Sequence, residues 1–168
     1  MKISMHQASA PRFANILRNL SAILDKAQAF CEAKKLEPAA LAGCRLIVDM
    51  FPLSRQVQVA CDSAKGAVAR LAGVEIPKHE DTEQTLAELK ARIAKTLDFI
   101  EGVPAAKLDG SEEREVVLKL RGQDVKFNGL QYLLGFAMPN FYFHVVTAYD
   151  ILRSNGVEIG KRDFIGTP

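Results

Sequence analysis

The residues best placed to do chemistry lie on the last helical stretch of the chain, predicted from Gly129 or Leu130 to Asn155. Asn140 and His144 are four residues apart in it, so in a helix they lie one above the other on the same face. The stretch is apolar around most of its circumference, which predicts that it lies inside a bundle and buries His144. A buried imidazole has to satisfy both ring nitrogens from within the protein. His144 therefore either hydrogen-bonds a buried partner and does nothing else, or binds a ligand or transfers protons.

A second helical stretch, predicted for residues 38–73, offers partners for His144. Asp49 stands between two apolar residues, and Gln56 follows it by seven residues on the same side of the helix. A buried carboxylate needs a hydrogen-bonding partner or a metal, and a histidine is one such partner. The other interpretation of Asp49 is an exposed ion pair with Arg45, which contributes only about 0.3–0.5 kcal/mol. Both interpretations stay open at this point.

The other two histidines are weaker candidates. His6 could add a second imidazole if the first turn of the chain folds back over one end of the bundle, although an exposed position is the simpler expectation. His79 lies in a polar loop, where we expect it to be solvated. The sequence contains no glycine-rich phosphate loop, no His-Glu-x-x-His and no Glu-x-x-His pair. The usual motifs of phosphate binding, zinc proteases and di-iron carboxylate sites are therefore missing.

The composition indicates one globular domain over residues 1–168, long enough to bury a sizeable core. A net charge of +2 with scattered basic residues does not favour a nucleic-acid or membrane partner. No apolar stretch approaches the roughly 20 residues that span a bilayer, and no leader segment is visible, so a cytoplasmic location is expected. The three cysteines include no Cys-x-x-Cys pair, which favours reduced thiols in the core.

Apolar periodicity predicts four helical stretches. The first runs from about Met5 to Lys35, with Pro11 near its start, so that residues 5–10 can form a separate turn. The second is interrupted by Pro52, which predicts a kink or a break into two pieces. The third begins at Asp81 or Thr82, with a capping-box pattern of Asp81 and Gln84, and ends at Gly102. Its solvated face is predicted to carry Glu88, Lys90, Arg92 and Lys95.

The pattern changes to strict alternation between the third and fourth helices. Residues 115–127 predict a short two-stranded hairpin with a turn at residues 121–124. A lone hairpin is only marginally stable, so it has to pack on the bundle. Asn128 then caps the fourth helix, which Pro139 interrupts. The predicted fold is all-α, a four-helix bundle with a small β-hairpin inserted between helices 3 and 4.

The run from Asn140 to Gly156 resembles the last helix of the DinB-like (DinB/YfiT) superfamily of metalloenzymes. In that superfamily the helix carries a His-x-x-x-His pair, whose second histidine opens a His-Arg-Gly-Gln segment followed by Leu-Arg and a Gly. His144 matches the second histidine, because Leu152-Arg153 and Gly156 follow at the expected distances. Asn140 occupies the place of the first histidine, and Val145-Val146-Thr147 replaces Arg-Gly-Gln.

Three stretches resemble an uncharacterised branch of that superfamily more closely, a bacterial domain of unknown function. They are Met5-His6-Gln7 with Pro11, Asp49-Met50-Phe51-Pro52-Leu53 with Gln56-Val57-Gln58, and Pro139-Asn140-Phe141-Tyr142-Phe143-His144 through Ile159-Gly160-Lys161-Arg162-Asp163-Phe164. Together these stretches span almost the whole chain.

The resemblance implies a four-helix bundle, often paired into a homodimer, with a divalent metal (typically nickel or zinc) held by three histidines near one end. Characterised relatives include thiol-dependent S-transferases and a maleylpyruvate isomerase. In this chain Asn140 replaces one histidine and the second helix has none, so Asp49 or Gln56 would have to stand in. The expected metal ligands are then His144, Asn140 and Asp49. Carboxylate and amide oxygens do not favour zinc or nickel as imidazoles do.

Three functions are compatible with this sequence. The first is a metal-dependent enzyme with a degenerate metal site, acting on a small molecule in the manner of a thiol-dependent transferase, with a metal-bound water as the working group. The second is a metal-free bundle that binds a small molecule, with His144 and Asp49 as polar anchors. The third is a structural homodimer in which these polar residues only set the register of the helices. The sequence leaves open whether the protein is an enzyme.

Overall fold

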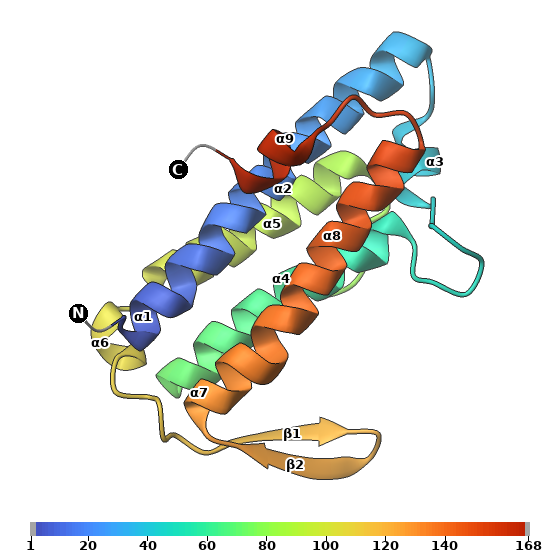
Figure 1. Cartoon of the computed structure of the whole chain (residues 1–168). Coiled ribbons are helices and arrows are strands. Elements are labelled where there is room, and N and C mark those ends of the chain that lie inside the picture. The colour runs from blue at the N-terminus through green and yellow to red at the C-terminus, as the bar shows by residue number, and fades with distance from the viewer. Residues whose placement is uncertain (1–2, 167–168) are drawn as a thin grey trace.

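The computed structural model describes residues 3–166 of the chain and shows four long helices packed side by side, with a two-stranded hairpin at one end (Figure 1). The elements in chain order are α1 (Met5–Ala8), α2 (Ala10–Lys34), α3 (Pro38–Ala42), α4 (Leu53–Ala72), α5 (Leu86–Gly102), α6 (Ala105–Leu108), β1 (Val116–Leu120), β2 (Gln123–Phe127), α7 (Gly129–Tyr132), the π-helix η1 (Leu133–Ala137), α8 (Met138–Ser154) and α9 (Lys161–Ile165). The predicted bundle and the hairpin between its third and fourth long helices are both confirmed.

The long helices α4 and α5 run in the same direction, and α2 and α8 run in the opposite direction (Figure 1). Two consecutive parallel helices need a connection that returns along the length of the bundle. Residues 73–85 make this connection without forming a helix or a strand. α4 packs against both α5 and α8, so it lies between these two helices.

Small side chains on α4 let the neighbouring helices approach closely. Ala60, Ala64 and Ala67 are all fully buried. Larger rings fill the space beyond them, and Phe13 meets Phe141 edge to face with the ring centroids 4.9 Å apart, an orientation that aromatic pairs favour. One apolar face of α8 is completely buried. Its members are Phe141, Val145, Ala148 and Leu152.

The prediction of one long second helix was wrong between residues 43 and 52. α3 ends at Ala42, and helical structure resumes only at Leu53, with Pro52 as the N-cap. A proline disfavours helical dihedral angles at the residue before it, here Phe51, so the helix cannot continue smoothly into α4. The break into two pieces is thus confirmed, but it is ten residues wide rather than local. Four large apolar side chains are exposed in this loop: Leu46, Ile47, Val48 and Phe51.

The third long helix begins later than predicted. Thr85 is the N-cap of α5 and forms a capping box with Glu88, each side chain bonding the backbone N–H of the other residue. The predicted capping box at Asp81 was wrong, because Asp81 forms an ion pair with Arg92 instead. Residues 81–84 therefore belong to the long connection rather than to α5.

The hairpin has the predicted position and a tighter turn. β1 and β2 pair antiparallel, with Val116 opposite Phe127. Arg121 and Gly122 form the two-residue turn, and both have positive φ values, 50° and 82°, as a type I′ turn requires. Val116 and Leu118 turn their side chains toward the bundle and are buried.

The helical rod that follows is continuous from α7 through η1 to α8. Asn128 caps it and forms a capping box with Gln131, which confirms the predicted start. The N–H of Met138 donates to the carbonyl of Leu133, five residues back, which is the hydrogen bond of a π-helix. This wider turn stands directly before Pro139, whose ring prevents the regular bond at that point.

The C-terminal segment packs across α2. Asp163 of α9 forms an ion pair with Lys26 at 2.7 Å, and Asn19 donates to the backbone oxygen of Phe164 at 3.0 Å. Within the part of the chain that the structure describes, none of the helices combines the length and the apolar character needed to span a bilayer.

We predict that Gly129→Ala destabilises the fold, because an added Cβ would lie 2.0 Å from the backbone oxygen of Ser111. The two segments would have to separate, and overpacking of this kind costs about 1–3 kcal/mol. Gly135→Ala is the matched control, since a Cβ at that position would meet no atom of another segment within 4 Å. Urea denaturation measures the free energy of unfolding of both variants. Equal midpoints would contradict the close approach at Gly129.

Candidate functional site

Three polar contacts join α4 to the rod formed by α7, η1 and α8. The three residues on α4 follow one another at seven-residue steps, so they lie on one helical face. The pairs are Gln56–His144, Ser63–Asn140 and Arg70–Tyr132. We call this row of contacts the polar seam. It runs along the interface between the two helices rather than at one end of the bundle.

His144 is 8% exposed and is paired with Gln56. Its Nδ1 lies 2.7 Å from the Gln56 Oε1. The Gln56 Nε2 donates to the backbone oxygen of Phe51 at 3.1 Å, which orients the amide so that its oxygen faces the imidazole. An amide oxygen can only accept, so Nδ1 carries the proton and Nε2 keeps its lone pair.

The imidazole of His144 is held in its neutral form. Burial lowers its pKa, and the positive charge of Arg55 lowers it further. Arg55 itself is oriented by an ion pair with Asp81 and by a hydrogen bond of 3.2 Å to Gln58. At neutral pH the Nε2 of His144 is therefore available to accept a hydrogen bond.

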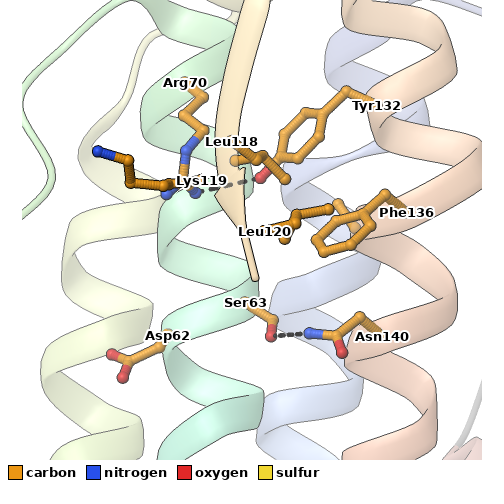
Figure 2. Close-up of a pocket in the computed structure, with 10 residues that line it drawn as sticks. Asp62, Ser63, Arg70, Leu118, Lys119, Leu120, Tyr132, Phe136 and Asn140 are labelled. Atoms are coloured by element: carbon orange, nitrogen blue, oxygen red, sulfur yellow. Dashed lines mark hydrogen bonds between the residues drawn. The ribbon is translucent and has the colours of Figure 1, made fainter. Parts of the chain in front are cut away.

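Asn140 forms the second contact of the seam. Its Nδ2 donates to the Ser63 Oγ at 2.7 Å (Figure 2). The amide is half-buried, one helical turn before His144. Asn140 and His144 therefore share a face, as predicted, but each has a separate partner on α4.

The structure places Asp49 away from His144. Asp49 is exposed in the loop between α3 and α4, so of the two open interpretations the one that makes it the buried partner of His144 is wrong. The prediction assumed a helix through this region, and without it Asp49 and Gln56 do not share a face. Gln56 takes the place of the buried partner. Arg45 does not pair with Asp49 either, and donates instead to two backbone carbonyls of the same loop.

The two other histidines lie elsewhere. The backbone N–H of His6 donates to Asp109 at 2.9 Å, and α1 packs on α2 and α6, at the end of the bundle where α5 ends (Figure 1). Gln56 lies near the start of α4, at the other end. His79 is not solvated as expected, since its Nδ1 is buried without a hydrogen-bond partner from the described residues. Burial lowers the pKa of His79, and the charge of Lys65 lowers it further.

The side chains around His144 do not fit a nickel or zinc centre. Besides one imidazole they offer the amides of Gln56 and Asn140, which are neutral and already hydrogen-bonded. The cation Arg55 is close enough to depress the pKa of the imidazole, and it would repel a metal ion as well. Among residues 3–166, no three side chains of His, Cys, Asp or Glu are grouped so that they could hold a metal ion. Zinc and nickel favour imidazole and thiolate ligands over such oxygens.

The polar seam borders a groove of about 390 Å³ between α4, β1 and the η1–α8 rod (Figure 2). Its polar side chains include Ser63, Arg70, Tyr132 and Asn140, and its apolar walls include Leu118, Leu120 and Phe136. Pockets for small organic molecules typically have about this size and this mixture of apolar walls and few polar groups. The hairpin thus forms one wall of a candidate binding site.

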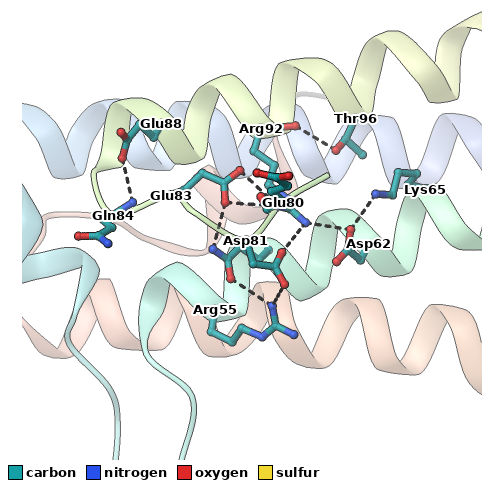
Figure 3. A network of polar contacts seen from close by, with 11 residues as sticks. Arg55, Asp62, Lys65, Glu80, Asp81, Glu83, Gln84, Glu88, Arg92 and Thr96 are labelled. Carbon is teal, nitrogen blue, oxygen red and sulfur yellow. Dashed lines mark hydrogen bonds and ion pairs between the residues drawn. The ribbon is translucent and has the colours of Figure 1, made fainter. Parts of the chain in front are cut away.

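A buried guanidinium lies on the other side of α4 (Figure 3). The Arg92 side chain of α5 is 1% exposed, and its Nη2 lies 2.9 Å from Asp62 and 3.0 Å from Asp81. Its Nη1 donates to the Glu80 carbonyl at 2.9 Å and pairs with Glu83 at 3.2 Å. These contacts fasten the connection 73–85 to both α4 and α5.

The prediction that Arg92 lies on the solvated face was wrong. Arg92 is three residues from Leu89 and four from Thr96, and both of these are buried. This spacing matches the inner stripe of the helix and was the signal that could have located it. Burial alone would lower the pKa of Arg92, but Asp62 and Glu83 raise it. The guanidinium is therefore charged and held by several acceptors.

Sequence reasoning also missed Ser63, Arg70 and Tyr132. The seven-residue recurrence of Gln56, Ser63 and Arg70 within a helix rich in alanine was a usable signal. Periodicity alone places these side chains on one face, but it does not say which residues of another helix they meet.

Comparisons with known proteins are consistent with this architecture. The family model described as "Domain of unknown function (DUF1993)" matches residues 5–165. A crystal structure described as a DinB family member protein from Shewanella denitrificans is similar to the chain, with 45% sequence identity and a TM-score of 0.91. The match covers 97% of this chain and 92% of the other. A comparison with curated proteins gave no match.

We predict that the protein loses stability when the pH falls below about 6.5, the ordinary pKa of histidine. Because the pKa of His144 is lowered in the folded state, the unfolded chain takes up a proton first. The contribution of neutral His144 to the free energy of unfolding is complete above that pH. It is lost as the pH falls toward the folded-state pKa. His79 acts in the same direction.

The measurement is the melting temperature at about pH 8 and about pH 5.5, on either side of the ordinary histidine pKa. Between about pH 8 and about pH 5.5 the melting temperature of the wild type should fall further than that of His144→Gln. The same comparison with His79→Gln gives the part of this fall that is due to His79. An identical pH dependence in wild type and His144→Gln would show that His144 is not held neutral.

We predict that Arg92→Ala costs about 1–3 kcal/mol, since it leaves the Glu83 carboxylate and the Glu80 carbonyl without their donor. Arg18→Ala is the control, because it removes only an exposed ion pair with Glu101 and should cost at most about 1 kcal/mol. Urea denaturation gives both values. A loss in Arg92→Ala no larger than in the control would mean that the network does not fasten the connection.

Proposed function

The chain belongs to the DUF1993 family, a domain of unknown function, and we propose that it is a DinB-like bundle that binds a small molecule without a resident metal. The binding site in this proposal is the polar seam together with the groove beside it. The function is thus recognition of a small organic ligand, and a chemical step is not required by the proposal.

One observation carries the proposal: the groups on the seam at His144 are an uncharged imidazole and uncharged amides. The resemblance to the DinB-like superfamily implies three imidazoles there. This chain presents one imidazole that is hydrogen-bonded to Gln56 at 2.7 Å and one amide, Asn140, that is bonded to Ser63 at 2.7 Å. Both groups recognise polar atoms of a ligand by hydrogen bonding. The amide is a weak ligand for zinc or nickel, and one imidazole does not complete a site for either metal.

Asn140 connects the seam to the groove, because it belongs to both. A ligand in the groove would lie against apolar walls from the hairpin and from η1. These walls exclude water, and the few polar groups orient the ligand, as in most small-molecule sites. His144 supports this arrangement from one turn away, since its bond to Gln56 helps to set the register of α8 on α4.

A second candidate function is that of a metal-dependent enzyme. The lone pair on the Nε2 of His144 favours it, because a neutral imidazole nitrogen is a common metal ligand. In this reading His144, Asn140 and Asp49 hold one nickel or zinc ion, as the family resemblance implies, and the protein is a thiol-dependent transferase. The loop 43–52 would then have to bring Asp49 over the seam. The homodimer implied by the same resemblance stays a prediction.

Elemental analysis by mass spectrometry distinguishes the two candidates. The protein is purified without a histidine tag or a chelator, and wild type is compared with His144→Ala, before and after incubation with nickel, zinc or manganese. We expect well below one metal ion per chain in both proteins. His79→Ala is the matched control, since it removes a histidine outside the seam.

About one metal ion per chain that is present in wild type and in His79→Ala but lost in His144→Ala would overturn the metal-free proposal. That result would make the transferase the primary candidate. Metal that is retained equally in all three proteins would be bound outside the seam, and the ligand site proposed for the seam and groove would still stand.

A further inference from the structure

Arg70 occupies an unusual position for a cation in the middle of a helix. Its Nη1 donates to the Tyr132 hydroxyl at 3.2 Å, and its Cζ lies 6.0 Å from the centroid of that ring (Figure 2). Gly66 makes room for the guanidinium, since a Cβ at this position would lie 2.5 Å from the Arg70 Nη1. A helical glycine costs about 1 kcal/mol relative to alanine. In exchange for this cost, Gly66 lets the half-buried guanidinium lie against the helix backbone at the wall of the groove.

The guanidinium of Arg70 has no carboxylate partner among the described residues, in contrast to that of Arg92, which has three. Its bond to Tyr132 is the one hydrogen bond that the guanidinium makes to residues 3–166, so its other N–H groups can donate to a ligand. The Tyr132 oxygen accepts from Arg70, so the phenol keeps its own proton to donate. Burial raises the pKa of Tyr132, which keeps that proton in place at neutral pH. Two donors thus stand side by side in the groove.

The remaining charges of the groove also favour an anion. Lys119 of β1 contributes a second cation at the exposed rim, and no ion pair joins it to the described residues. Asp62 is the only acid among the lining residues. Its carboxylate is already bound by Arg92 and by Lys65, each at 2.9 Å. The uncompensated charges of the groove are therefore both positive.

We propose that the groove binds a small organic anion whose carboxylate or phosphate group is held by Arg70 and Tyr132, with Lys119 at the rim. The apolar part of the ligand packs on Leu118, Leu120 and Phe136. This inference rests on the proposed function and names the class of its ligand. Guanidinium groups bind carboxylates and phosphates through paired hydrogen bonds, which makes arginine the usual choice for such recognition.

The size of the groove limits the ligand. A volume of about 390 Å³ is at the lower end of the range for small-molecule sites. It accommodates a ligand of about one ring with its acidic group. Aromatic acids are suited to it, because Tyr132 and Phe136 offer stacked rings whose centroids are 6.2 Å apart.

The test is a titration followed by ¹⁵N–¹H NMR with three small aromatic probes. Benzoate and phenyl phosphate represent the two kinds of anion, and benzamide is the neutral isostere of benzoate. We expect millimolar concentrations of at least one anion to shift the amide signals of residues around Arg70, Leu118 and Tyr132. Benzamide should bind at least about tenfold more weakly, since it lacks the charge-assisted bonds.

Four variants separate the contributions of charge and position. Arg70→Gln should weaken anion binding about tenfold or more, and Lys119→Gln should weaken it less. Lys126→Gln is the matched control, because it removes a cation of the same hairpin that pairs with Glu115. Gly66→Ala keeps every charge but displaces the guanidinium, so it should also weaken binding while the protein stays folded.

Three outcomes would overturn the inference. Equal affinity for benzoate, phenyl phosphate and benzamide would show that charge is not selected, although a small-molecule groove would stand. Anion binding that is unchanged in both Arg70→Gln and Gly66→Ala would place the anion elsewhere. The absence of any shift in the groove with all three probes would contradict both the anion site and the binding function proposed for the groove. Preference for one anion over the other identifies the acidic group.

Discussion

The burial of α4 against α8 is the constraint on which the rest of the structure depends. Two helices that cover each other over most of their length must pair every polar side chain on the shared face, because an unpaired buried group costs about 1–3 kcal/mol. The polar seam is the result, with Gln56 meeting His144 and Ser63 meeting Asn140. A shift of one helix by one turn would break these contacts together. The seam therefore sets a single register, and the position of the groove follows from it.

The parallel course of α4 and α5 imposes a second requirement. The chain has to return along the bundle between them, and residues 73–85 do so without backbone ladders of their own. The Arg92 guanidinium holds this connection in place. Its nitrogens lie 2.9 to 3.2 Å from carboxylate oxygens of the connection and of α4. The same contacts occupy the carboxylate of Asp62, which borders the groove. A structural network on one side of α4 thus neutralises the acid that borders the groove on the other side.

The family relationship and the chemistry of the site lead to different expectations. A match over residues 5–165 and a TM-score of 0.91 leave no doubt about the fold. A function resides in the side chains of a site, however, and not in the fold that carries them. In this chain an amide stands beside His144 where the superfamily pattern has an imidazole. In the structure this amide is hydrogen-bonded to Ser63 at 2.7 Å, which is the observation behind the metal-free proposal.

The sequence by itself determined the elements and their inner faces. The spacing of apolar residues located the four long helices, strict alternation located the hairpin, and Asn128 marked the start of the last helical rod. These features depend on neighbours along the chain, so a periodic pattern is enough to predict them. Even the burial of His144 followed from the apolar surface of its own helix.

Only the tertiary structure decided which side chains meet. Asp49 and Gln56 were equivalent candidates for His144 until the break before Pro52 removed Asp49 from the helix. Arg92 was assigned to the solvent because a charge is usually exposed, and it is buried because carboxylates from a distant segment reach it. Partners on different helices are separated by tens of residues, and their pairing depends on helix register and on the path of the connections. A pattern local to one helix holds no information about either.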